Sequence, residues 1–154
     1  MQKALELGAT DIIDASKGDN YIRSQISNIT QKKGADVSID AAGFYSTCEN
    51  AVHCTRRGGR MIQVGLPIDS DQRPPIVPMG SVAGKEIEIV GSHGFAAMDM
   101  PQILEMVRTK VLQPKKLVQK EVTLREGAKA IQDMDFGSPL GITMVTKFHE
   151  KSRL

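Results

Sequence analysis

The chain has 154 residues, 40% of them hydrophobic and 25% charged, and its 20 basic and 18 acidic side chains give a net charge of +2. This length and composition are typical of a globular domain with a hydrophobic core, and they exclude a disordered tail. The balanced charge gives no reason to expect a nucleic-acid or membrane partner. No apolar run approaches the roughly 20 residues that a bilayer span needs.

Cysteine content and the two ends of the sequence bear on location. Two cysteines and a start without an apolar leader favour a cytoplasmic protein. The last three residues, Ser152, Arg153 and Leu154, are close to the Ser-Lys-Leu peroxisomal signal. We therefore expect a cytoplasmic location, with a peroxisomal one as the alternative if the source is a eukaryote.

The first half of the sequence alternates predicted helices and strands. We expect the end of a helix at residues 4–8, a helix over residues 19–33 and another through Cys48 that Gly58 ends after Arg57. The expected strands are 11–14, 37–41, 61–65 and 86–91, and residues 67–80 are expected to form a loop. Such alternation predicts an α/β fold with parallel strands, whose carboxyl ends share the edge where these sheets bind ligands.

The pattern changes from about residue 93 onward. Asp99 and Pro101 are typical of a helix start, and apolar residues from Ile103 to Val107 give that helix a packing face. A short strand over residues 120–124, a helix over 125–134 and a closing strand over 141–148 follow. We therefore expect a second segment of different character.

Six short motifs, in this order and spacing, resemble the rear of the nucleotide-binding domain of zinc-type alcohol dehydrogenases, which belong to the medium-chain dehydrogenases. They are Leu7–Ala9, Gly34–Val37, Ile39–Gly43, Arg57–Arg60, Val64–Pro67 and Ile89–Gly94. The resemblance implies that residues 1–92 are the rear part of a doubly wound dinucleotide-binding (Rossmann) domain. It implies that residues 93–154 return to complete the catalytic domain. The expected activity is hydride transfer between an alcohol or aldehyde and NAD or NADP.

The same resemblance places the cofactor contacts at three strand ends. The first loop would meet the adenine side of the cofactor, and the second would meet the nicotinamide amide. The residues concerned are Ala41, Ala42, Gly43, Phe44, Val64, Gly65, Leu66, Val90, Gly91 and Ser92. A glycine at a strand end is explained equally well by a tight turn, so that alternative stays open.

Other features of these enzymes have no counterpart in the sequence. There is no Gly-x-Gly-x-x-Gly turn for the pyrophosphate, so NAD and NADP are not distinguished. Cys48, His53 and Cys54 share one helix at spacings that do not converge on a metal, which favours buried cysteines. His93 has the chemistry for proton transfer, but a loop imidazole bonded to backbone is favoured. We expect no catalytic or metal-binding residue here, and zinc only in a missing N-terminal half.

Two alternatives to an alcohol dehydrogenase remain open. One is a zinc-free quinone reductase of the same superfamily. The other is a non-catalytic remnant that dimerises. Under each of these readings, the alcohol dehydrogenase included, we expect the chain alone to be inactive. We also expect a homodimer or homotetramer to form through the edge strand at residues 86–90.

Overall fold

A computed structural model describes residues 2–67, 76–137 and 140–148 of the chain. The chain forms two compact units, Met1–Gly94 and Phe95–Leu154, whereas the predicted boundary lay between residues 92 and 93. The assignment of these units to a nucleotide-binding domain and a catalytic segment stays a prediction. The possible peroxisomal signal Ser152–Leu154 lies outside the described residues.

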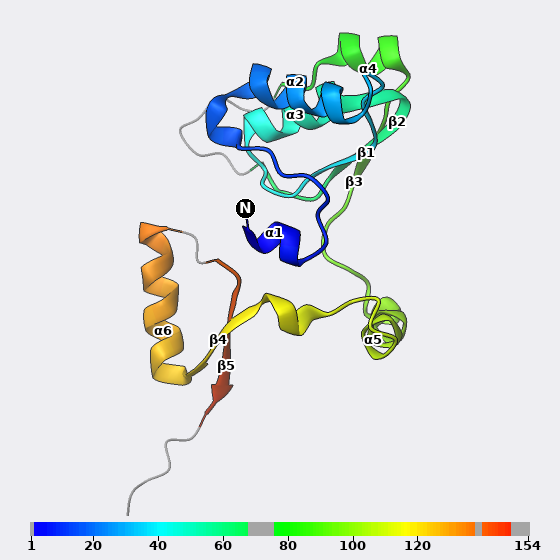
Figure 1. Cartoon of the computed structure of the whole chain (residues 1–154). Coiled ribbons are helices and arrows are strands. Elements are labelled where there is room, and N and C mark those ends of the chain that lie inside the picture. Colours follow the sequence, from blue (N-terminus) through cyan, green and yellow to red (C-terminus); the bar gives the residue numbers. More distant parts are fainter. Residues whose placement is uncertain (1, 68–75, 138–139, 149–154) are drawn as a thin grey trace, which may run out of the picture. The chain divides into compact units, whose positions relative to one another are not determined.

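The first unit is a parallel sheet with helices along it (Figure 1). Its strands pair in the order β1-β2-β3, all parallel, which confirms the predicted α/β class. Helices α3 and α4 contact the sheet, and α2 packs beside α3. The elements are α1 Gln2–Glu6, η1 Ala15–Lys17, α2 Asp19–Ile29, β1 Ala35–Asp40, α3 Tyr45–Cys54, β2 Thr55–Gln63, α4 Met79–Lys85 and β3 Glu88–Gly91.

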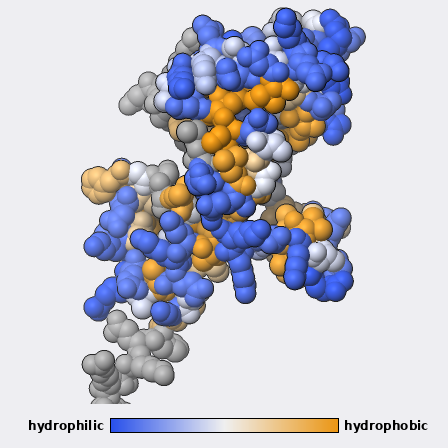
Figure 2. Space-filling model, in the orientation of Figure 1, coloured by the Kyte–Doolittle hydropathy of each residue, from blue (hydrophilic) through white to orange (hydrophobic). Residues whose placement is uncertain are grey.

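The core of the first unit lies between α3 and one face of the sheet. Its buried apolar members are Cys48, Val52, Met61 and Ile87. Side chains alternate across a strand, so Val37 and Ile39 point to the opposite face, where they are 51% and 61% exposed. Figure 2 shows a hydrophobic area on this unit amid a largely hydrophilic surface. Within the described residues, helices pack on one face of the sheet, and the other face leaves Val37 and Ile39 exposed.

A buried amide links α2 to α3. The side chain of Asn50 accepts a hydrogen bond from Arg23 Nε at 2.8 Å and donates one to Asp19 Oδ1 at 2.7 Å. Both functional atoms of this amide are therefore paired, as burial requires. The two helices are fixed to each other by polar geometry as well as by packing.

The strand predicted at residues 11–14 does not form, and this prediction was wrong. A strand needs a neighbour for its backbone groups, and residues 11–14 have none among the strands of the described sheet. Asp14 instead caps the short helix η1, where its carboxylate accepts a hydrogen bond from Ser16 N at 3.0 Å.

The predicted end of α3 was also wrong. The helix ends at Cys54, and residues 55–59, which were expected to be helix and breaker, belong to β2. Gly58 takes a φ of +62°, and the register of the β1–β2 pair shifts between Ala35 and Val37. A glycine pair inside a strand is typical of such an irregularity, because it absorbs the extra residues without a side-chain clash.

Helix α4 begins inside the region predicted as the loop 67–80. Its glycine-rich sequence has low helix propensity, which is why the pattern did not reveal it. Lys85 Nζ donates to the carbonyl oxygens of His53 at 2.8 Å and Thr55 at 3.1 Å, and Glu86 takes a left-handed φ of 56° at the C-cap. Contacts with the rest of the unit, rather than local preference, place this helix.

The second unit contains the predicted helix, strand, helix and strand, with ends that differ by a few residues. Strands β4 and β5 pair in parallel, and α6 packs on them (Figure 1). Gly127 permits this close approach, because a Cβ there would lie 2.5 Å from Val145 Cγ2. The elements are η2 Ala97–Asp99, α5 Met100–Arg108, η3 Pro114–Leu117, β4 Val118–Thr123, α6 Leu124–Asp133, η4 Met134–Phe136 and β5 Ile142–Lys147. In the described part of the chain, no helix is long and apolar enough to cross a membrane.

Met61 should be essential to the small core of the first unit. It is only 1% exposed, so Met61→Ala is expected to lower the free energy of unfolding by about 2–5 kcal/mol, the usual cost of truncating a buried methionine. Urea denaturation followed by circular dichroism measures the change. Met79→Ala is the matched control, since Met79 is 63% exposed and its loss should matter by less than about 0.5 kcal/mol. Equal effects of the two substitutions would contradict this account of the core.

Candidate cofactor-binding site

The structure brings the three predicted strand ends to one edge of the sheet. The carbonyl oxygen of Asp40 accepts hydrogen bonds from Val64 N and Gly65 N, both at 2.9 Å. The amide of Ser92 donates to the carbonyl oxygen of Gln63 at 2.9 Å. Residues 41–44, 64–66 and 90–92, which include every predicted cofactor contact, therefore lie along this edge.

A buried carboxylate sits at the centre of this edge. Asp40 is 2% exposed, and its Oδ1 accepts from Ala42 N at 3.0 Å and Gly43 N at 3.1 Å. Its Oδ2 accepts from Gln63 Nε2 at 2.7 Å. Neither Asp40 nor Gln63 was among the predicted site residues. An acid at the end of a buried strand is a signal for Asp40, because a buried charge needs dedicated donors.

Asp40 is held in its charged form. Burial raises the pKa of this carboxyl, but the hydrogen bonds from Gln63, Gly43, Thr47 and Ala42 together outweigh burial and bring the pKa below the ordinary value of 3.8. The group is therefore an anion at neutral pH and does not serve as a proton donor there. Its effect is to organise the donors around it.

Gln63 connects this carboxylate to the second loop. Its Nε2 also donates to the carbonyl oxygen of Gly65 at 2.7 Å. Two acceptors around one nitrogen fix the orientation of the amide. The Oε1 atom is buried and has no hydrogen-bond partner among the described residues. One carboxamide thus joins the end of β1 to the loop after β2.

The glycines of the two loops are required by the packing of the loops on each other. Gly43 has a φ of +77°, and a Cβ there would lie 2.5 Å from the carbonyl oxygen of Leu66. A Cβ on Gly65 would overlap Gly43 N and lie 2.7 Å from Ala42 C. At Gly91, by contrast, an added Cβ meets nothing within 4 Å. Of the three strand-end glycines, Gly91 alone faces open space.

The surface of the edge suits flat, partly apolar rings. Phe44, Val64 and Leu66 are all exposed large hydrophobic residues. Ala41 and Ala42 are small and exposed, and Gly91 and Ser92 continue the edge at the end of β3. Aromatic bases pack well against such surfaces. The residues present therefore fit the base and nicotinamide portions of a dinucleotide, while these loops offer no lysine or arginine to its phosphates.

The cysteine and histidine side chains within residues 2–67, 76–137 and 140–148 do not form a metal centre. Burial raises the pKa of the Cys48 thiol and the partly buried Cys54 thiol, which disfavours the thiolates that bind zinc. Burial, followed by the charges of Arg23 and Lys85, lowers the pKa of His53. The described residues contain no group of three or more histidine, cysteine or acidic side chains that could hold a metal, so they do not fit zinc.

His93 lies on the exposed segment after β3. The hydrogen bond to backbone that the sequence favoured for its imidazole does not occur among the described residues. Its exposure leaves the imidazole free to meet solvent. A role in proton transfer, which the sequence did not favour, stays an open alternative.

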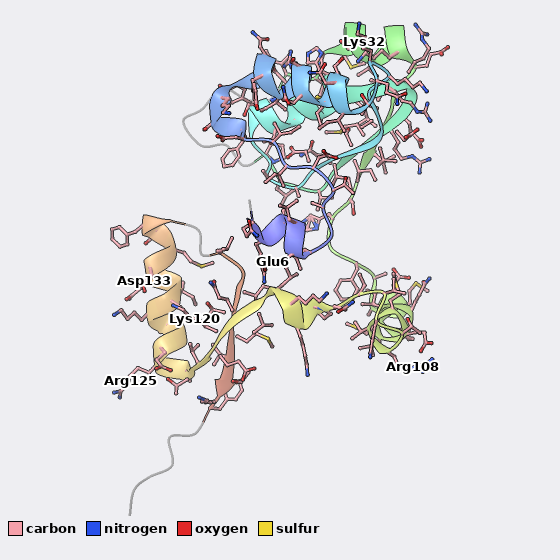
Figure 3. All side chains as sticks on the ribbon, in the orientation of Figure 1. Glu6, Lys32, Arg108, Lys120, Arg125 and Asp133 are labelled. Atoms are coloured by element: carbon pink, nitrogen blue, oxygen red, sulfur yellow. The ribbon has the colours of Figure 1, made fainter. Side chains whose placement is uncertain are left out.

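The second unit contains a separate hollow of about 710 Å³ between α6 and the β4–β5 pair. Its lining is mainly apolar, and it includes Lys120 and Asp133, which Figure 3 labels on β4 and α6. None of the predicted site residues lines it. The edge of the first unit therefore remains the candidate site.

Comparison with known proteins agrees with the motifs at this edge. The pattern of the family described as zinc-binding dehydrogenase matches residues 1–109. The chain belongs to the zinc-binding dehydrogenase family.

Curated relatives of this zinc-binding dehydrogenase chain include an L-idonate 5-dehydrogenase and several sorbitol dehydrogenases. It is 33% identical to L-idonate 5-dehydrogenase of Vitis vinifera over 80% of its residues, and 30% identical to sorbitol dehydrogenase of Bacillus subtilis over 86%. These matches span only 33% and 36% of the relatives' lengths.

Solved structures show the same fold. The 2R,3R-butanediol dehydrogenase of Bacillus subtilis is 26% identical, with a TM-score of 0.72 over 88% of this chain and 38% of that one. An NAD-dependent alcohol dehydrogenase at 22% identity gives a TM-score of 0.77 over 94% of this chain and 40% of that one. The family match and the curated relatives make this chain part of an oxidoreductase family.

Acid should weaken the first unit through Asp40. Because folding lowers the pKa of Asp40, its stabilisation is complete above the ordinary value of 3.8 and is lost as the pH falls through the lower folded value. We expect the urea midpoint of the wild type to fall between about pH 5 and pH 2, and to fall less in Asp40→Asn. Asp36→Asn is the comparison, since the hydrogen bond from Arg56 also lowers the pKa of Asp36, but on the exposed surface, where solvent weakens the pair, so this variant should lose less of the acid sensitivity. Full acid sensitivity in Asp40→Asn would contradict this role.

Alanine substitutions at Gly65 and Gly91 should affect stability differently, because only Gly65 is packed against another loop. Gly65→Ala is expected to cost about 1–3 kcal/mol of stability, because its Cβ overlaps the first loop. Gly91→Ala has room for its methyl group and should change stability by less than about 0.5 kcal/mol. Thermal unfolding of the two variants tests this contrast, and a tolerated Gly65→Ala would show that the loops are not in close contact.

Proposed function

We propose that this chain supplies one wall of the nicotinamide-dinucleotide site of an alcohol dehydrogenase-like oxidoreductase. The observation that carries the proposal is the exposed apolar edge where β1, β2 and β3 end, in a chain whose family is that of zinc-binding dehydrogenases. When bound, the nicotinamide would accept a hydride from the alcohol carbon or return one to the carbonyl.

The loops divide the cofactor between them. Residues 41–44 face the adenine side, residues 64–66 meet the nicotinamide amide with their backbone, and the open space at Gly91 lets the cofactor pass close to β3. Phe44 and Leu66 supply apolar contact on either side. The chain's residues thus bind and orient the cofactor, and no proton or hydride step is assigned to them.

The substrate class follows from the relatives' names. They are dehydrogenases of sorbitol, L-idonate and 2R,3R-butanediol, all of which carry a secondary alcohol beside another hydroxyl. We therefore propose a secondary alcohol of a polyol or diol as the substrate. Because the described residues do not fit zinc, the chain alone should not oxidise alcohols, and any metal would be held elsewhere in the protein.

Assembly through β3 is a further part of the proposal. β3 is an edge strand of the described sheet, with one side free for pairing, and it begins at Glu88 rather than at the predicted residue 86. A two-fold contact along Glu88–Gly91 would extend the sheet between copies in a homodimer or homotetramer.

Dinucleotide binding to the edge is directly measurable. On titration of the isotopically labelled chain with NADH, we expect the amide signals of Gly43, Gly65 and Gly91 to shift, while that of Gly127 in the second unit stays in place. Gly91→Ala should weaken the binding without unfolding the chain, because its methyl group would occupy the cofactor's path. Absence of shifts at the strand ends up to about 5 mM NADH, corresponding to less than about 3 kcal/mol of binding free energy, would reject the proposed function. A parallel assay should detect no oxidation of sorbitol by the chain alone.

A further inference from the structure

We propose that Asp40 and Gln63 are positioning residues, which fix the loop 41–44 relative to the loop 64–66 so that both meet one dinucleotide. The inference rests on the proposed function and names the side chains that set the geometry of that site. Neither residue touches the cofactor in this account. They act through the loops to which they are hydrogen-bonded.

The hydrogen bonds form a continuous connection between the loops. Asp40 Oδ1 holds the amides of Ala42 and Gly43, and Oδ2 meets Gln63 Nε2 at 2.7 Å. The same nitrogen donates to the carbonyl oxygen of Gly65 at 2.7 Å. One loop is therefore held through its amides and the other through a carbonyl, with a carboxylate and a carboxamide between them.

Burial of Asp40 and of the Gln63 Oε1 atom leaves little of the pair for direct contact with a ligand. Asp40 is 2% exposed, and Gln63 Oε1 is buried without a partner in the described part of the chain. A cofactor on the exposed edge would meet Phe44, Val64 and Leu66 instead. The pair is therefore placed to act on binding through the loops to which it is hydrogen-bonded.

The loops have little freedom to compensate for a lost connection. They meet at Gly43 and Gly65, where even a methyl group would clash with the opposite backbone. In a close-packed contact of this kind, even a small change in the conformation of one backbone displaces the other. Removal of the connection should thus change the spacing of the two loops.

The polar pair is costly if stability alone is considered. The pair buries a charge and leaves the acceptor Gln63 Oε1 without a partner in the described residues. Replacement of such buried polar groups by well-packed apolar residues often leaves the stability of a protein unchanged or raises it. The pair instead fixes the geometry of the loops, since its hydrogen bonds hold the amides of Ala42 and Gly43 and the carbonyl oxygen of Gly65 in place. We infer that this geometric role explains an amide at residue 63.

The expected signature is a loss of cooperation between the two halves of the cofactor. A site that holds both ends of a ligand at the right spacing binds the whole more tightly than either part. If spacing is disturbed, affinity for the dinucleotide falls while each half still fits its own loop. A general loss of structure would instead weaken all three ligands together.

Gln63→Met tests the inference, because methionine is nearly isosteric but cannot donate to Asp40 or Gly65. Affinities of the full chain for NADH, for AMP and for nicotinamide mononucleotide are measured by chemical-shift titration. We expect the affinity for NADH to fall about tenfold, as for the loss of about 1.4 kcal/mol, and the affinity for each half to change less than about twofold. Asp40→Asn, which keeps the shape of the acid, should show the same pattern if Gln63→Met fails to fold.

Ser38→Ala is the matched control. Ser38 is also on β1, donates to the carbonyl oxygen of Ala51 at 2.9 Å and lies 2.6 Å from Thr55 Oγ1. Its loss should lower stability without changing any of the three affinities.

The other possible results separate the positioning role of Asp40 and Gln63 from the proposed function. Unchanged NADH affinity in Gln63→Met overturns the positioning role and leaves the proposed function intact. Equal weakening of NADH, AMP and nicotinamide mononucleotide also overturns the positioning role, because it indicates local unfolding. Failure of the wild-type chain to bind NADH at the strand ends overturns both the proposed function and this inference.

Discussion

A buried carboxylate is tolerated only when donors surround it, and the donors of Asp40 come from both sides of the edge where the sheet ends. Backbone amides of residues 42 and 43 reach it from the first loop, and the Gln63 amide reaches it from β2. Its main-chain oxygen meanwhile accepts from Val64 and Gly65. Asp40 therefore accepts hydrogen bonds from both loops, through its side chain and through its main chain. These bonds set the positions of the loops and so the shape of the exposed edge.

Helices that are specified by nearby residues, such as caps and apolar stripes, could be predicted from the sequence. Helix α6 has a capping box in Thr123 and Glu126 as well as an apolar stripe, and α5 has proline in its first turn. The strand at residues 11–14 failed for the opposite reason. Its apolar pattern is real, but a strand exists only when another strand accepts its hydrogen bonds, and no window of sequence contains that information.

The candidate site could likewise be predicted only in part from the sequence. Glycines after strands are visible in the sequence, and a family resemblance gives them a role. The physical need for Gly43 and Gly65 is visible only in space, because the atoms that exclude a side chain belong to the other loop. Asp40 and Gln63 are 23 positions apart, and their contact depends on strand register together with the irregularity at Gly58. Periodicity indicates which face a residue occupies but not which residue it meets across the sheet.

Two features of the sheet limit what this chain could contribute to a dinucleotide site. Parallel sheets are normally covered on both faces, yet Val37 and Ile39 are exposed on one side of β1 in the described residues. A dinucleotide crevice in an open α/β sheet also needs groups for the pyrophosphate, and the strand-end loops provide no cationic side chain. The pyrophosphate of a bound dinucleotide would therefore have to be held by groups outside these loops. The hydrogen bonds of Asp40 set the shape of the edge in the absence of a ligand, and pre-organisation of that kind would lower the entropic cost of binding a cofactor there.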